Sequence, residues 1–160
     1  MLALIIVLIL NAVAITANNK NLDKLKDEVY LISKYSTANS FIVNRIDELY
    51  TQAVTFSDAD LITSANDQYQ IILQNIDNIS ALDDGSNRTA ISNFKADLKE
   101  YNKVAAEIVD GFISGNVDFS VIQEKSKVKA DLFEKLTAEL KRFSKKTDDA
   151  YTALAEDAKA

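Results

Sequence analysis

Long stretches of this chain contain no residue that interrupts an α-helix. Its 160 residues include no proline and only three glycines. Proline removes a helical hydrogen bond and glycine lowers helix stability, so both are scarce inside long helices. Hydrophobic residues make up 48% of the chain, which is too many for a disordered protein. The sequence therefore predicts an all-α fold made of long helices.

Apolar residues recur every three or four positions in four successive segments. This rhythm is typical of helices that pack side by side around a common core. It predicts helices at about residues 20–54, 58–82, 87–113 and 119–158. The recurring positions are Leu22, Leu25, Val29, Ile32, Val43, Ile46, Tyr50 and Ala53 in the first segment, Ile62, Ala65, Tyr69, Ile72, Ile76 and Ile79 in the second, Ile91, Phe94, Leu98, Tyr101, Ala105, Ile108 and Phe112 in the third, and Val121, Ile122, Val128, Leu132, Leu136, Leu140, Phe143, Tyr151 and Leu154 in the fourth.

The segments between these helices are short and carry residues that favour helix ends. Ser57 can cap the second helix, Gly115 is suited to the end of the third, and Asp118 or Ser120 can cap the fourth. Short turns make consecutive helices antiparallel neighbours. The expected fold is therefore an up-down-up-down four-helix bundle formed by residues 20–160.

The first helix carries a second apolar line beside its seam, at Tyr35, Ile42 and Leu49. Two apolar lines present more apolar surface than the other helices of one bundle need to bury. We therefore expect a homodimer that pairs through the first helix.

The chain starts with an apolar segment, residues 1–19, that contains no charged residue. A membrane-spanning helix needs about 20 apolar residues, and this segment is slightly shorter and lacks a preceding basic residue. Both features are typical of a span truncated at its start. A cleaved signal peptide and a buried core helix are the alternatives. With no helix breaker near residue 19, we expect the membrane helix to continue directly into the first bundle helix.

Charge and composition exclude several classes of function. The formal net charge of −6 disfavours nucleic acid, whose phosphates require a basic surface. The chain has no cysteine and no histidine, so neither haem ligation by histidine nor catalysis by a nucleophile–histidine pair is expected. The turn that starts at Asp83 resembles a calcium loop, but its twelfth position is Phe94 instead of glutamate. We expect no enzyme activity, no metal site and no cofactor.

Two polar residues, Ser36 and Asn39, occupy core positions in the first helix. Polar residues at such positions fix the register or pairing of helices, and they can also line a ligand pocket. Both interpretations remain open for these two residues.

The arrangement of an apolar span, a long first helix, two shorter helices and a long fourth helix resembles the periplasmic domains of methyl-accepting chemotaxis receptors. Two short stretches resemble the family more closely. Residues 44–47, Asn-Arg-Ile-Asp, are similar to the Thr-Arg-Ile-Asn stretch of the aspartate-sensing receptors, and Arg45 matches the first of three ligand-clamping arginines. Tyr50 and Val54 stand where the other two would be. Residues 115–123 resemble the entry to the family's fourth helix, where Gln123 matches a ligand-contacting glutamine, although Lys125 replaces a typical threonine.

The resemblance implies a ligand-sensing domain in the inner (cytoplasmic) membrane, with residues 20–160 on the periplasmic side. The expected ligand-binding residues are Arg45, Asn39 and Gln123, in the membrane-distal half of the bundle. Arg45 would bind an anion, or it is an ordinary surface arginine. Ligand binding would reach the cytoplasm through a small displacement of the fourth helix, and the ligand itself stays open.

Two alternative functions share this sequence pattern. The domain could serve as the sensor of a histidine kinase or a diguanylate cyclase, which would differ only in the output domain. A structural, membrane-anchored coiled-coil stalk would need no ligand.

Overall fold

The chain folds into four long helices: α1 (Leu2–Phe56), α2 (Asp60–Leu82), α3 (Arg88–Ser114) and α4 (Phe119–Asp157). The computed structural model describes the backbone of residues 2–83, 85–115 and 118–157, and their side chains except those of 2–18, 20, 21, 24, 25, 154, 155 and 157. In this part of the chain, all regular secondary structure is helical. The expected all-α fold with four helices is confirmed.

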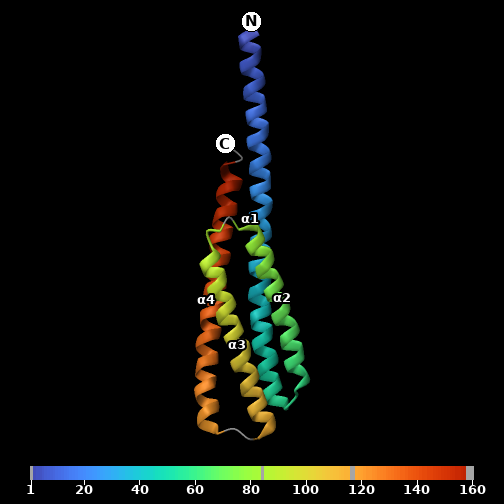
Figure 1. Cartoon of the computed structure of the whole chain (residues 1–160), viewed down its shortest axis with the longest axis vertical. Coiled ribbons are helices and arrows are strands. Elements are labelled where there is room, and N and C mark those ends of the chain that lie inside the picture. Colours follow the sequence, from blue (N-terminus) through green and yellow to red (C-terminus); the bar gives the residue numbers. More distant parts are fainter. Residues whose placement is uncertain (1, 84, 116–117, 158–160) are drawn as a thin grey trace.

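The helices run alternately up and down, so each is antiparallel to the next along the chain (Figure 1). The α1–α2 and α3–α4 turns lie at one end of the bundle, which we call the distal end. The α2–α3 turn lies at the opposite end, which we call the proximal end. Both α1 and α4 extend past the α2–α3 turn (Figure 1).

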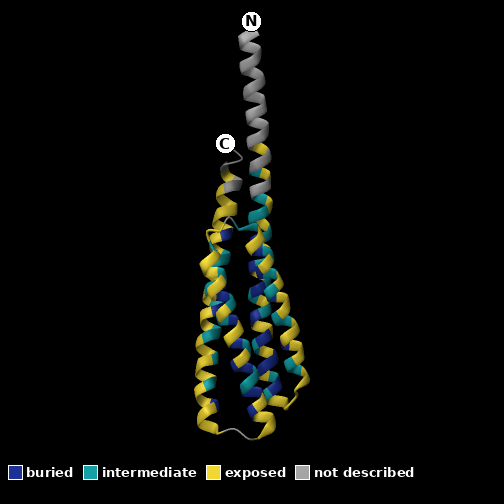
Figure 2. Ribbon diagram, viewed as in Figure 1, coloured by how far each residue is buried: buried dark blue, intermediate teal, exposed yellow. Residues whose placement is uncertain are grey.

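An apolar core runs between the helices, with a smaller cluster of Val104, Ile108 and Ile122 beside it, and most of this core is formed by the predicted seams (Figure 2). The seam predictions at Phe112, Val121, Val128 and Tyr151 are wrong, because these side chains are exposed. In α1, Val43, Ile46, Tyr50 and Ala53 are at most 1% exposed. Ile72 of α2, Leu98 of α3 and Leu136 of α4 are fully buried against them. Burial of apolar surface in this core is the main force that holds the helices together.

The second apolar line of α1 packs mostly inside the bundle. Leu49 is 3% exposed and belongs to the core, and Ile42 packs against that core. These two side chains face helices of the same chain because α1 contacts α2, α3 and α4. The surplus apolar surface that suggested pairing through the first helix is therefore smaller than the sequence indicated.

One predicted helix cap is wrong and another is confirmed. Ser57 does not cap α2, because its φ of 52° places it in the left-handed region of the turn. Instead, Asp58 accepts a hydrogen bond from the Asp60 amide at 2.9 Å. Asp118 caps α4 by accepting a bond from the Ser120 amide at 2.9 Å. Gly115 ends α3 with a φ of 66°, a conformation that glycine adopts without strain.

The apolar segment at residues 1–19 lies almost wholly outside the described side chains. Its backbone is helical from Leu2 and continuous with the rest of α1. Among the residues whose side chains are described, no helix is long and apolar enough to cross a membrane. The membrane span therefore stays a prediction from sequence.

The core predicts a large difference between two substitutions on α4. Leu136 is fully buried, so Leu136→Ala should lower the free energy of unfolding by about 2–5 kcal/mol, because it leaves a cavity. Val128 is 41% exposed, and Val128→Ala should change it by no more than about 0.5 kcal/mol. Urea denaturation followed by circular dichroism measures both. Similar losses in the two variants would contradict this placement of the core.

Candidate ligand site in the bundle core

The two polar core residues of α1 differ in how their hydrogen bonds are satisfied. The Ser36 hydroxyl donates to the carbonyl of Ile32, one helical turn earlier, at 2.7 Å. The Asn39 side chain is fully buried. Its Oδ1 accepts a bond from Nδ2 of Asn75 on α2 at 2.8 Å. This cross-helix bond fixes α1 against α2, as the register interpretation of Asn39 requires.

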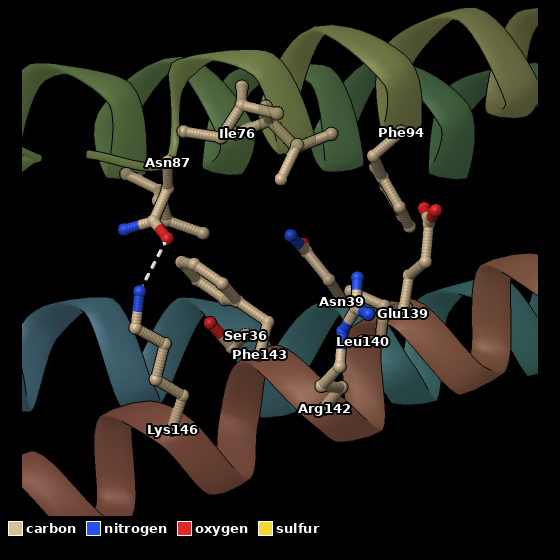
Figure 3. Close-up of a pocket in the computed structure, with 13 residues that line it drawn as sticks. Ser36, Asn39, Ile76, Asn87, Phe94, Glu139, Leu140, Arg142, Phe143 and Lys146 are labelled. Carbon is tan, nitrogen blue, oxygen red and sulfur yellow. Dashed lines mark hydrogen bonds between the residues drawn. The ribbon is translucent and has the colours of Figure 1, made fainter. Parts of the chain in front are cut away.

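The Nδ2 atom of Asn39 is buried and has no hydrogen-bond partner among the described residues. A buried donor without a partner costs about 1–3 kcal/mol of stability. Figure 3 shows this nitrogen pointing into the space between the helices. The Oδ1 atom of this amide therefore fixes α1 against α2, and its Nδ2 atom is available to donate a hydrogen bond.

The space in front of Asn39 is a cavity of about 270 Å³ that is partly open to solvent, where exposed residues such as Ala90 and Arg142 line it, and we call it the core cavity. All four helices contribute to its wall. It is lined by Ser36, Asn39, Ile76, Ile79, Asn87, Ala90, Ile91, Phe94, Glu139, Leu140, Arg142, Phe143 and Lys146.

Helix spacing and side-chain size both account for the core cavity. α1 packs closely along α2 and α4, whereas α2 and α3 pack less closely against each other. Small side chains, Ser36 and Ala90, stand where larger ones would fill the gap. The cavity lies towards the proximal end, because its wall reaches Asn87 at the start of α3.

Charged groups of α4 lie around the core cavity. The Lys146 ammonium donates to Oδ1 of Asn87 at 2.9 Å and links α4 to the α2–α3 turn (Figure 3). Glu139 is half-buried, and its Oε2 atom is shielded from solvent and has no hydrogen-bond partner in the part of the chain that the structure describes. Arg142, one turn further along α4, also lines the cavity. The wall thus combines apolar side chains with one unpaired donor and one unpaired acceptor.

The structure does not place all three predicted ligand-binding residues around this cavity. Asn39 lines it, but towards the proximal end instead of in the expected membrane-distal half, and Arg45 and Gln123 are absent from its wall. Arg45 and Glu48 are both exposed and form an ion pair at 3.0 Å, and Gln123 is exposed within the first two turns of α4. The ligand-binding roles of Arg45 and Gln123 stay predictions.

Sequence reasoning missed Glu139, which is the acceptor of the core cavity. A signal was present, because Glu139 lies three residues after Leu136 and directly before Leu140, both of which are core positions. A charged residue that is adjacent to buried positions of its helix lies close to the core of the bundle. Nothing in the sequence indicated that it would face a space left open between α2 and α3.

A second polar cluster, nearer the distal end, has its groups paired with one another. The carboxylate of Asp47 on α1 accepts a bond from the Tyr101 hydroxyl at 2.7 Å and forms an ion pair with Lys129 of α4. The Tyr50 hydroxyl donates to Oδ1 of Asn102 on α3 at 2.7 Å. These bonds link α1 to α3 and α4, so the cluster has a structural role.

Burial in this cluster changes the acidity of its tyrosines. It raises the pKa of Tyr50 to about 12, with smaller electrostatic contributions from Asp110 and Tyr69. Burial also raises the pKa of Tyr101 far above its ordinary value, and the hydrogen bond to Asp47 adds to the effect. Both hydroxyls are therefore protonated donors at neutral pH.

No protein-family model, curated protein or solved structure matches this chain. The likeness to chemotaxis receptors therefore rests on the order and lengths of the helices and on the two short stretches around Arg45 and Gln123.

The raised pKa of Tyr50 predicts a loss of stability in alkali. A free tyrosine titrates near pH 10, so between pH 10 and about 12 the unfolded chain loses this proton while the folded chain keeps it. The stabilisation is present below pH 10 and is lost as the pH rises towards 12. In Tyr50→Phe, the free energy of unfolding should fall less steeply over this range. Urea denaturation at a series of pH values measures it.

The exposed Tyr30, at 55%, provides the control variant Tyr30→Phe. Equal pH slopes in Tyr50→Phe and the unmodified chain would show that Tyr50 ionises as readily in the folded state as in the unfolded state.

Proposed function

We propose that this chain is the extracytoplasmic ligand-sensing domain of a membrane-anchored receptor of the chemotaxis type. One observation carries the proposal: a ligand-sized cavity lies among all four helices and contains the unpaired amide nitrogen of Asn39. Ligand pockets are typically concave and mostly apolar, with a few polar groups that fix orientation. The apolar segment at residues 1–19 supports the proposal of a membrane anchor. The order and lengths of the helices, which resemble those of chemotaxis receptors, support the proposed receptor type.

The position of α4 in the cavity wall suggests how binding would be transmitted. Glu139, Leu140 and Phe143 of α4 line one side, and α1, α2 and α3 form the others. A ligand between them would favour one position of α4 relative to α1 over another, which is all that a conformational signal requires. α4 is 39 residues long and contains neither proline nor glycine. Such a helix is stiff enough to carry a small displacement to its proximal end.

A stalk is expected to have a fully packed core, whereas a sensor needs an open space for its ligand. A structural coiled coil gains stability by filling its core, because voids lose dispersion contacts. The unpaired Asn39 nitrogen lowers stability and offers a stalk no benefit. The sensors of kinases and cyclases share the proposed role and differ only in the output domain.

A chimera tests the sensing role. The full chain, joined to the second span, linker and cytoplasmic hairpin of a chemotaxis receptor, should control the receptor-coupled kinase when a ligand is added. Candidate ligands are amino acids, organic acids, inorganic anions and small amides. Because the chain has no cysteine, spin labels at Lys34→Cys and Asp149→Cys report the spacing of α1 and α4. Labels at Lys34→Cys and Thr51→Cys, both on α1, provide the control distance.

The expected result is a change in kinase activity together with a changed α1–α4 distance and a constant distance within α1. A chimera that responds to no ligand class, with a fixed α1–α4 distance, would favour the stalk.

We also propose that two copies pair through α1, around Phe41, which is 73% exposed. Burial of one such aromatic side chain contributes about 1.5–3 kcal/mol. Phe41→Ser should therefore raise the dimer dissociation constant by about tenfold or more, as measured by sedimentation equilibrium of the full chain in lipid nanodiscs. The control is Phe119→Ser, which changes an exposed phenylalanine at the distal end of α4. Equal effects of the two changes, or a monomer throughout, would argue against this interface.

A further inference from the structure

The core cavity has a size and a wall that restrict what it can hold. A volume of about 270 Å³ is far above the roughly 10–15 Å³ that a single water needs in a cavity, so it has room for a small organic molecule. Most of the wall is aliphatic or aromatic, and it includes Ile76, Ile91, Phe94 and Phe143. An apolar body of a few carbon atoms fits such a wall better than several waters do, because water needs polar partners in a cavity.

The two unpaired polar atoms restrict the other end of the occupant. Among the described residues, neither Nδ2 of Asn39 on α1, a donor, nor Oε2 of Glu139 on α4, an acceptor, has a hydrogen-bond partner. An occupant that satisfies both atoms accepts a hydrogen bond from α1 and donates one to α4. A ligand that does both replaces two unsatisfied groups with two hydrogen bonds, and it also connects the two helices.

The charges around the cavity favour a neutral head group. Glu139 carries a negative charge and Arg142 a positive one, while the Lys146 ammonium is bonded to Asn87. A carboxylate on the ligand would lie near the Glu139 oxygen, and an ammonium would offer no acceptor to Asn39. Bringing a charge next to a buried neutral amide also carries a large desolvation cost.

We propose that the core cavity binds a small, mainly aliphatic molecule with a neutral amide-like head, whose carbonyl accepts from Asn39 and whose N–H donates to Glu139. This ligand class deepens the sensing role and rests on it for its biological meaning. Binding itself is measured without any signalling output.

The probe is 4-methylpentanamide, added to the full chain in lipid nanodiscs with ¹³C-labelled isoleucine methyl groups. The methyl signals of Ile76, Ile79 and Ile91, which line the cavity, should shift on binding. The signals of Ile46 and Ile122, which are buried elsewhere in the bundle, should stay in place. No shift at the three lining residues, or equal shifts at all five, would overturn the proposal.

Two analogues test the head group. In 5-methylhexan-2-one, a methyl group replaces the amide nitrogen, so the donor to Glu139 is lost. In 4-methylpentanoate, a carboxylate oxygen takes the same place. Each should bind at least about fivefold more weakly than the amide, which is the lower bound for the loss of one hydrogen bond. If either binds as tightly as the amide, the polar pair does not select the head group and the proposal fails.

Two substitutions with matched controls test the protein side. Asn39→Leu and Glu139→Leu should each raise the dissociation constant of 4-methylpentanamide by about fivefold or more. The controls are Asn44→Leu and Glu134→Leu, which change exposed residues on the same two helices outside the cavity wall. They should leave the dissociation constant within about twofold. The unchanged methyl signal of Ile46 verifies folding, and Glu139→Leu, at a half-buried position, keeps the test valid if Asn39→Leu does not fold.

These outcomes separate the ligand class from the sensing role. A chimera that responds to another ligand while the amide leaves the cavity signals unchanged would refute the ligand class alone. Amide binding in the cavity without any response of the chimera would refute the sensing role alone.

Discussion

Burial of one broad face of α1 against three other helices holds this bundle together. Val43, Ile46 and Tyr50 are almost fully buried, and α1 packs against α2, α4 and, less extensively, α3. α2 and α3 contact each other less closely than each contacts its other neighbour. The other helices are therefore positioned mainly by α1 and α4, and the space between α2 and α3 is filled less completely. The core cavity follows from this uneven packing.

The periodicity of the sequence was sufficient to predict the helices and most of their buried faces, although Val121 and Val128 of α4, predicted as core positions, are exposed. A helical face is a local property, because residues three or four apart lie on one side whatever they pack against. Val43, Leu98 and Leu136 are fully buried as the seams predicted. The cap at Ser57 was wrong because the conformation of a turn depends on how the two helices meet. The second apolar line of α1 was assigned to a partner chain because periodicity does not tell how many neighbours a helix has.

The candidate site was only partly predictable for the same reason. Asn39 stood out because an amide at a core position breaks a local rule. Its partner Asn75 and the open space beside it depend on the distance between helices that are far apart in sequence. Glu139 carried a weaker signal, since long charged side chains near a seam usually reach solvent. Here its Oε2 is shielded from solvent and has no hydrogen-bond partner among the residues that the structure describes.

The two polar clusters of the bundle show how similar residues can serve different purposes. In the distal cluster, Asp47 has Tyr101 and Lys129 as partners, and Tyr50 has Asn102. Such a network fixes the helices in one arrangement, because moving any of them would leave a buried group unpaired. Around the core cavity, the unpaired atoms of Asn39 and Glu139 lower stability and gain from any partner that enters. The distal half of the bundle is thus suited to hold the helices in register, and the proximal half to change with what it binds.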